Sequence, residues 1–247
     1  MHAPLHFVYH LPKTGGQTIR RHLQTHLEPS GRLLFLGKGT RDRPLTRNDV
    51  EAMRPSELDD VLAVCGHPLE RSMSKLWPDR RLREVLFVRE PAERMVSHYN
   101  FACAMATKRN TPKQDFLEFF DSHGPNPMLS YAAERLGIEK RSEFLSGALA
   151  ALSCFWMVGT TDSIDLLSPK LFASLGIAET KAKRANISGE EFPRVLSLTP
   201  EITELVHQRD AEDLMLFEAC KRMESATLRR FGLAPSPAFV PEIGFTS

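Results

Sequence analysis

The chain has 247 residues, of which 42% are hydrophobic and 26% are charged, as in an ordinary soluble globular protein. This length suits a single domain over residues 1–247 with a substantial buried core, and it leaves little room for two domains. The chain has 32 Lys and Arg residues and 31 Asp and Glu residues, so its formal net charge is only +1. No global charge therefore favours a nucleic acid or a membrane surface as partner. Any anion-binding site must therefore be local.

The cysteines and the first residues bear on the cellular compartment. Four cysteines are spread over the chain without a CxxC pair, so neither a disulfide framework nor a zinc site is predicted, which fits a reducing cytosol. No basic segment followed by an apolar stretch opens the chain, and the longest weakly polar stretch, residues 146–159, is too short to span a bilayer. We therefore expect a cytoplasmic protein without a transmembrane segment.

Short apolar runs alternate with segments of helical periodicity. Strands are predicted at residues 6–10, 32–36, 60–65, 84–88 and 155–159. Helices are predicted from the glycine turn to residue 27, from a capping box at residue 46, over residues 91–107, 113–121, 127–136, 142–152 and 164–175, from residue 199, and over residues 210–230, with a polar loop at residues 181–193. The alternation predicts an α/β fold with a P-loop-like central parallel sheet flanked by helices on both faces, and with ligands at the carboxyl ends of the strands.

The first predicted strand is followed by residues with the properties of a phosphate cradle. Gly15 and Gly16 let the backbone approach an anion closely, and the helix that follows presents its positive end. Lys13 adds a full positive charge, and the hydroxyls of Thr14 and Thr18 add donors. The segment is not a Walker A loop, because Lys13 precedes both glycines, and it is not a GxGxxG fingerprint. An ordinary strand-to-helix turn with an exposed lysine is the alternative interpretation.

Polar residues also follow two of the other predicted strands. Arg89 ends one strand and Ser97 lies eight residues later in the next helix, where a guanidinium and a hydroxyl could hold a second phosphate. The alternatives are a surface ion pair for Arg89 and a solvated helix position for Ser97. His67 follows the strand at residues 60–65, where an imidazole could accept a proton near neutral pH, although each of the nine histidines could also be structural.

Together these segments resemble the sulfotransferases that use 3′-phosphoadenosine-5′-phosphosulfate (PAPS) as the sulfuryl donor. Residues 11–18 closely resemble the 5′-phosphosulfate loop of that family, and residues 87–99 resemble its 3′-phosphate-binding motif. The segment Gly66-His67-Pro68 is similar to the Gly-His-x-Pro element of the carbohydrate branch, which contains the heparan sulfate 2-O- and chondroitin-type sulfotransferases. Two specific motifs in the right order are far less expected by chance than either one alone.

The resemblance implies that the chain transfers a sulfuryl group from PAPS to a hydroxyl of an acceptor, with adenosine 3′,5′-bisphosphate as the product and without a metal. The donor-binding loop would consist of Lys13, Thr14, Gly15, Gly16, Gln17 and Thr18, whose amides would hold the 5′-phosphate. Arg89 and Ser97 would hold the 3′-phosphate. His67 would act as the base, and Lys13 would neutralise the departing oxygen.

Weaker resemblances extend over most of the chain. They comprise an Asn-x-Met helix start at residues 126–128, a Val-Gly-x-x-Glu strand–helix unit at residues 155–175 with Asp162 in place of Glu, a short Asn-bearing loop at residues 186–188, and a closing helix at residues 210–221. The chain departs from the family at Ser130-Tyr131, where relatives often have an arginine. This departure leaves one polar contact to the nucleotide or the acceptor open.

Alternatives remain at the level of residues and of function. Glu70 is a rival base, and His10, His98 and Glu90 are weaker rivals. A kinase-like phosphotransferase or a non-catalytic nucleotide-binding protein would share the cradle, although the sequence has neither a Walker lysine nor a metal-holding aspartate in the expected place. The acceptor is expected to be a carbohydrate or glycoconjugate. If the chain is an excised domain of a Golgi enzyme, its compartment is the lumen.

Overall fold

The protein has an α/β fold built on a five-stranded parallel sheet with the strand order β2-β3-β1-β4-β5. The computed structural model describes residues 3–37, 44–178 and 194–233. The strands are β1 (Leu5–Tyr9), β2 (Leu33–Leu36), β3 (Ala63–Gly66), β4 (Leu82–Val88) and β5 (Met157–Thr160). In the register of the sheet, Tyr9 at the end of β1 lies beside Gly66 of β3 and Leu86 of β4, so these three strands end at the same edge.

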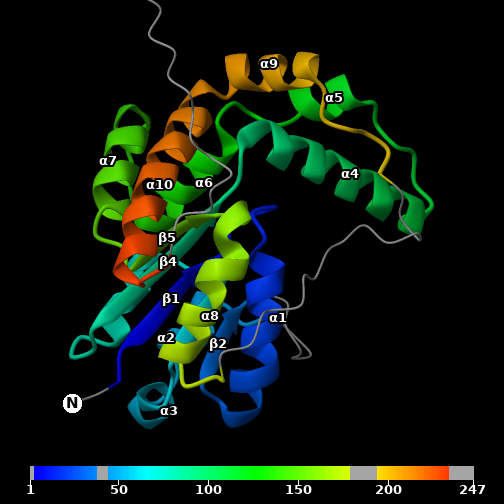
Figure 1. Cartoon of the computed structure of the whole chain (residues 1–247). Helices are drawn as coiled ribbons and strands as arrows, with labels where there is room; N and C mark the ends of the chain where they lie inside the picture. Colours follow the sequence, from blue (N-terminus) through cyan, green and yellow to red (C-terminus); the bar gives the residue numbers. More distant parts are fainter. Residues whose placement is uncertain (1–2, 38–43, 179–193, 234–247) are drawn as a thin grey trace, which may run out of the picture.

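Helices cover both faces of the sheet, as predicted from the alternation of strands and helices. On one face, α1 (Gly16–Leu27) and α8 (Ile164–Ser174) enclose an apolar cluster with Val8 at its centre. On the other face, α6 (Pro127–Leu136), α7 (Phe144–Leu152) and α10 (Ala211–Arg230) enclose a larger cluster that contains Phe7. Figure 1 shows the two layers on either side of the strands. Neighbouring strand residues point to opposite faces, which explains why β1 is apolar at almost every position.

The remaining helices extend the structure beyond the carboxyl edge of the sheet. Helix α4 (Pro91–Arg109) follows β4 directly and packs with α5 (Phe116–Asp121) and α9 (Pro200–Arg209) around a third apolar cluster, along the upper side of Figure 1. Two short helices, α2 (Arg47–Glu51) and α3 (Pro55–Asp59), precede β3. Among the described residues, no helix is both long enough and apolar enough to cross a membrane.

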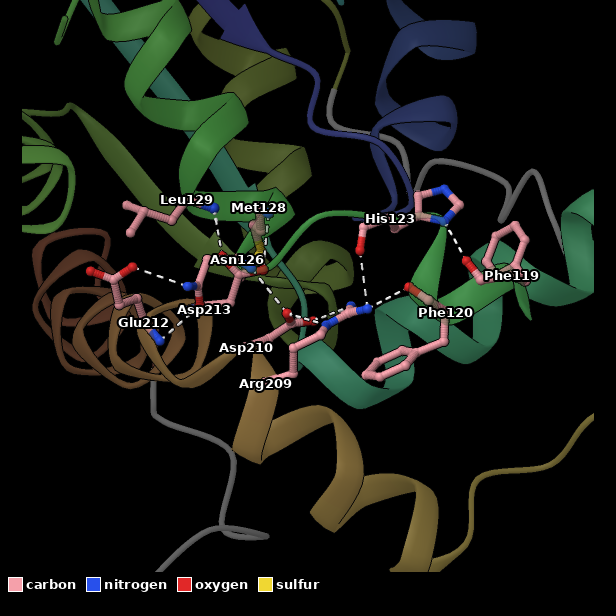
Figure 2. Close-up of polar contacts among 10 residues, drawn as sticks. All are labelled: Phe119, Phe120, His123, Asn126, Met128, Leu129, Arg209, Asp210, Glu212 and Asp213. Carbon is pink, nitrogen blue, oxygen red and sulfur yellow. Dashed lines mark hydrogen bonds and ion pairs between the residues drawn. The ribbon is translucent and has the colours of Figure 1, made fainter. Parts of the chain in front are cut away.

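A buried polar junction joins the N-termini of α6 and α10 (Figure 2). The Asn126 amide N–H donates to Asp210 Oδ1 over 2.9 Å, and the Asn126 side-chain oxygen accepts from the Glu212 N–H over 2.9 Å. Asp213 accepts from the N–H groups of Met128 and Leu129. Carboxylates at a helix start satisfy amides that have no partner within the helix, so this junction fixes the angle between α6 and α10.

The structure confirms the predicted strands and most helix boundaries, with a few differences. The predicted strand at residues 155–159 begins two residues later, at Met157, where the pairing with Val85 of β4 begins. The strand predicted at residues 60–65 begins three residues later, at Ala63, where its pairing with β1 and β2 begins. Helix α5 begins three residues later than predicted, because the Asp115 side chain caps it by accepting from the Glu118 N–H. Helix α3 and a 3₁₀ turn at Arg71–Leu76 were not predicted. The predicted loop at residues 181–193 lies outside the described residues.

Candidate active site

A cavity of about 640 Å³ opens at the carboxyl edge of the sheet, above the ends of β1, β3 and β4. Because these three strands are neighbours, the polar segments that follow them meet there. The predicted donor-binding and catalytic residues that line the cavity are Lys13, Gly15, Gly16, Gln17, Thr18, His67, Arg89 and Ser97. Segments that are about 75 residues apart in the chain thus contribute to one site, as expected at the strand ends of a parallel sheet.

The glycines of the loop after β1 are required by close packing. Gly15 has a φ of +80°, and a Cβ at this position would lie 2.3 Å from Ile164 Cδ1 on α8. Gly16 is the first residue of α1, and a Cβ there would lie 2.1 Å from the His10 ring. The first turn of α1 contains no acidic residue, so its amides and its positive end favour an anion.

Two details of the loop differ from the sequence-based expectation. The Thr14 side chain is buried, and its hydroxyl donates to the Leu11 carbonyl over 3.1 Å, so it stabilises the loop and does not face a ligand. The Thr18 N–H donates to the Gly15 carbonyl over 3.0 Å. The Thr14 hydroxyl and the Thr18 amide are thus already paired within the loop.

Lys13 and the start of α4 form the cationic wall of the cavity. Lys13 itself has a left-handed φ of +70°, a strained conformation for a residue with a Cβ. Burial, and to a smaller extent the nearby Arg89 guanidinium, lower the pKa of Lys13 to about 8. Arg89 is held by its Nε donating to Glu93 Oε2 over 3.2 Å, and Ser97 lies about two turns into the same helix.

His67 lies on the opposite side of the loop, directly after β3. Its Nδ1 donates to the His10 carbonyl over 2.8 Å, and since a carbonyl only accepts, this bond places the ring proton on Nδ1. The Nε2 atom therefore carries the lone pair. The residue is exposed on the cavity side, and packing of the rest of the ring lowers its pKa, so the imidazole is neutral at neutral pH.

The rival bases have other roles in the fold. Glu70 forms ion pairs with Arg47 at 2.7 Å and with Arg135 at 3.8 Å. Glu90 caps α4 and contacts His207 Nε2 at 2.6 Å. Neither carboxylate is among the described residues that line the cavity.

The two rival histidines do line the cavity, but His10 is buried and His98 is half-buried. Burial lowers the pKa of His10 to about 3 and that of His98 to about 4. The Nδ1 atom of each ring is buried without a hydrogen-bond partner among the described residues. Of the candidate bases, His67 is thus the one whose accessible nitrogen and neighbours suit proton acceptance.

Several cavity residues were not identified from the sequence. Phe101 lies one turn beyond Ser97 on α4, so helical periodicity could have indicated it. Asp165 and Arg194 also line the cavity, and no local pattern indicates them. Arg194 comes from a distant segment, which Asn100 holds by accepting from the N–H groups of residues 195 and 196 over 2.9 Å.

The positions noted for weaker resemblance are partly explained. Asp162 lines the cavity, and residues 126–128 start α6 in the polar junction described above. Tyr131, at the departure from the family pattern, donates its hydroxyl proton to the His67 carbonyl. The polar contact of Tyr131 is therefore made within the protein, to the backbone of the candidate base His67. Residues 186–188 lie outside the described residues.

In the comparisons with known proteins, the similarity found is to solved structures. No family model matches the chain, and no match was found among curated proteins. Among solved structures, the chain is similar to a sulfotransferase from Alicyclobacillus acidocaldarius, with 11% sequence identity, coverage of 91% of this chain and 96% of that chain, and a TM-score of 0.47. A likeness at this identity and TM-score carries no information about the reaction or the substrate.

Proposed function

We propose that the protein is a sulfotransferase that moves a sulfuryl group from PAPS to a hydroxyl of an acceptor. The observation that carries this proposal is the meeting of three motifs in one cavity: the Lys13 loop, the Arg89 and Ser97 pair, and His67. The similarity of these three motifs to the sulfotransferase family supports it. The whole chain would act as one domain.

The two anionic ends of PAPS would bind to different residues of the cavity. The amides of Gly15 and Gly16, together with the positive end of α1, suit the 5′-phosphosulfate. Arg89 and Ser97 suit the 3′-phosphate, since a guanidinium binds phosphate oxygens bidentately. A requirement for the 3′-phosphate would distinguish PAPS from ATP.

In the proposed reaction, the acceptor oxygen attacks the sulfur in line with the departing bridging oxygen. A new S–O bond forms, the S–O bond to the 5′-phosphate breaks, and its electron pair stays on the phosphate of adenosine 3′,5′-bisphosphate. His67 Nε2 accepts the proton of the acceptor hydroxyl. The Lys13 ammonium neutralises the charge that grows on the bridging oxygen.

The acceptor is proposed to be a carbohydrate or glycoconjugate hydroxyl. The Gly-His-x-Pro element after β3 supports this choice, because it resembles the carbohydrate branch of the family. The ring of Phe101 is 43% exposed where it lines the cavity, and the flat apolar face of a sugar ring could pack against it.

Ligand discrimination tests the donor site. Titration calorimetry should show tight binding of adenosine 3′,5′-bisphosphate, much weaker binding of 5′-AMP, and no preference for ATP with Mg²⁺. At a bisphosphate concentration of about one hundred times its Kd, the folded state should gain about 2.7 kcal/mol of stability. A preference for ATP with Mg²⁺ would indicate a phosphotransferase. Bisphosphate binding without PAPS consumption across a panel of glycoside acceptors would indicate a nucleotide-binding protein without this activity.

Substitution of the base tests the reaction itself. His67→Ala should lower kcat by about 10²- to 10⁴-fold, because general base catalysis contributes rate factors of this size. Bisphosphate affinity should stay within about threefold. Glu70→Gln is the matched control, since its carboxylate is paired outside the described cavity lining, and it should keep most of the activity. Near-normal turnover of the His67 variant would show that the base is another group.

A further inference from the structure

His10 contacts both the candidate base and the phosphate loop. It follows β1, is only 4% exposed, and its ring stacks on the His67 ring with a centroid distance of 4.1 Å and an interplanar angle of 22°. Its backbone carbonyl accepts the hydrogen bond from His67 Nδ1. One residue thus restrains both the tilt and the rotation of the His67 imidazole.

The His10 ring also lies against the backbone of the loop. A Cβ built on Gly16 would lie 2.1 Å from His10 Cδ2 and 2.6 Å from His10 Nε2, so the ring occupies the space that any side chain at Gly16 would need. Helix α1 begins at this glycine. The His10 ring therefore contacts both the start of α1 and the ring of His67, and we call it the spacer.

A second restraint on His67 comes from α6, on another side of the residue. The Tyr131 hydroxyl donates to the His67 carbonyl, and the two rings meet edge to face with centroids 6.4 Å apart. The Arg135 guanidinium lies over the Tyr131 ring at 4.9 Å, which limits the movement of that ring. The segment after β3 is thus held between β1 and α6.

We propose that His10 and Tyr131 are positioning residues that hold the His67 imidazole with Nε2 toward the cavity. This inference rests on the proposed function, because it concerns the same base. The physical reason is that proton transfer requires the donor and acceptor atoms to be within hydrogen-bond reach in a defined direction, and a displacement of about 1 Å can lower a rate by about 10²-fold. His67 is exposed, so its ring needs such neighbours to stay in one orientation.

The test compares His10→Ala, His10→Phe and Tyr131→Phe in the full-length protein. His10→Ala removes the spacer, whereas His10→Phe keeps a flat ring against His67. Tyr131→Phe removes only the hydroxyl that donates to the His67 carbonyl. His22→Ala is the matched control: it also removes a histidine that contacts an aromatic ring, Phe172 at 3.9 Å, but it is not among the described residues that line the cavity.

Three quantities should be measured for each variant: kcat with PAPS and an acceptor, Kd for adenosine 3′,5′-bisphosphate, and the protonated ring nitrogen of His67 by ¹⁵N NMR, assigned with the His67→Ala protein. We expect His10→Ala to lower kcat at least about tenfold, with the Kd for the bisphosphate unchanged within about threefold. His10→Phe should recover most of this loss of kcat. Tyr131→Phe should lower kcat severalfold. The His67 proton should lie on Nδ1 in the wild type. His10→Ala keeps the backbone carbonyl that accepts this proton, but without the stacked ring the imidazole should leave this hydrogen bond part of the time, and the proton should then be distributed over both nitrogens. His22→Ala should change none of these quantities.

Other outcomes would overturn the inference. If kcat and bisphosphate affinity fall together in His10→Ala, the residue supports the loop and not the base. If Tyr131→Phe and His10→Ala both match the wild type in kcat and His10→Ala keeps the Nδ1 proton, neither residue positions His67. Absence of PAPS turnover in the wild type would defeat the proposed function, and the NMR measurement would still decide whether the His10 ring keeps the His67 imidazole in its hydrogen bond to the backbone carbonyl of residue 10.

Discussion

The ammonium nitrogen of Lys13 lies 4.2 Å from the centroid of the Phe101 ring, so the loop after β1 touches helix α4 across the cavity. Contact with an aromatic face stabilises a cation, whereas burial and a nearby positive charge both disfavour it. Here Arg89 is that second charge, and the lowered pKa of Lys13 reflects both effects. The folded protein therefore carries an electrostatic cost at Lys13 that a bound anion would relieve.

Replacement of Lys13 should separate activity from stability. The unfolded chain holds this proton up to its ordinary pKa of 10.5, whereas the folded protein releases it near pH 8, so the charged lysine destabilises the fold below pH 8. Lys13→Met should raise the free energy of unfolding by about 1 kcal/mol at pH 7, a value reduced for the partial exposure of the side chain. PAPS turnover should fall at least about a hundredfold.

Urea unfolding and turnover assays check this prediction, with Lys75→Met as the control. Lys75 is exposed, and its replacement should change stability by less than about 0.5 kcal/mol. A Lys13→Met protein that is less stable than the wild type would contradict the electrostatic explanation.

Gly15→Ala should destabilise the protein and abolish bisphosphate binding. Both the left-handed φ and the approach of Ile164 oppose a Cβ at this position. Gly31→Ala is the matched control, because Gly31 also has a left-handed φ, +71°, but a Cβ there would meet nothing within 4 Å. We expect a loss of about 1 kcal/mol for the control and about 1 kcal/mol more for Gly15→Ala, measured by urea unfolding, because the atom in the way is the end of the flexible Ile164 side chain. Equal losses would mean that the Ile164 side chain turns away from the loop at no cost.

Arg89→Ala should weaken bisphosphate binding by about 10- to 100-fold, which corresponds to the loss of one charge-assisted interaction with phosphate. Binding of 5′-AMP should change little, because AMP has no 3′-phosphate. Arg54→Ala is the control, since Arg54 pairs with Glu57 at 3.1 Å on the surface as Arg89 pairs with Glu93. If the Arg89 variant lost affinity for both nucleotides equally, Arg89 would bind a group that both nucleotides share.

The free energy of unfolding should fall as the pH drops below 6.5. Burial lowers the pKa of His6 and His98 to about 4 and that of His10 to about 3, so the unfolded chain binds protons there that the folded protein does not bind. Burial also raises the pKa of Asp213 to about 6, which offsets one of these protons below pH 6. We expect a net loss of about 3 kcal/mol between pH 7 and pH 5.

Urea titrations at several pH values check the sign and size of this loss. His6→Asn should flatten the pH dependence, and replacement of the exposed His26 by Asn should leave it unchanged. Stability that rises on acidification would contradict the prediction.

Local patterns in the sequence were sufficient to predict the order and most boundaries of the elements. Pro91 at the first position of α4, and Thr199 followed by Pro200 at the start of α9, specify helix starts through their own backbone and side-chain preferences. The capping box at Thr46 does the same for α2. These signals depend on neighbours within four residues, so the sequence is enough to find them. Such local signals do not show which partner a side chain finds. The Thr14 hydroxyl was predicted to donate to a ligand, but it donates to the Leu11 carbonyl within the loop.

Tertiary structure alone decided which of these residues meet. The strand order places the ends of β3 and β4 on either side of β1, and no local periodicity specifies that order. The contact of His10 with Gly16 and the pairing of Glu70 with Arg47 depend on how the loops after the strands fold over the sheet edge. The sequence by itself determined the chemical groups and the elements that carry them. Which groups share the cavity was determined by how distant segments pack against the two faces of the sheet. Burial of apolar surface fixes the positions of the strands and helices, and these positions place the polar side chains at their ends.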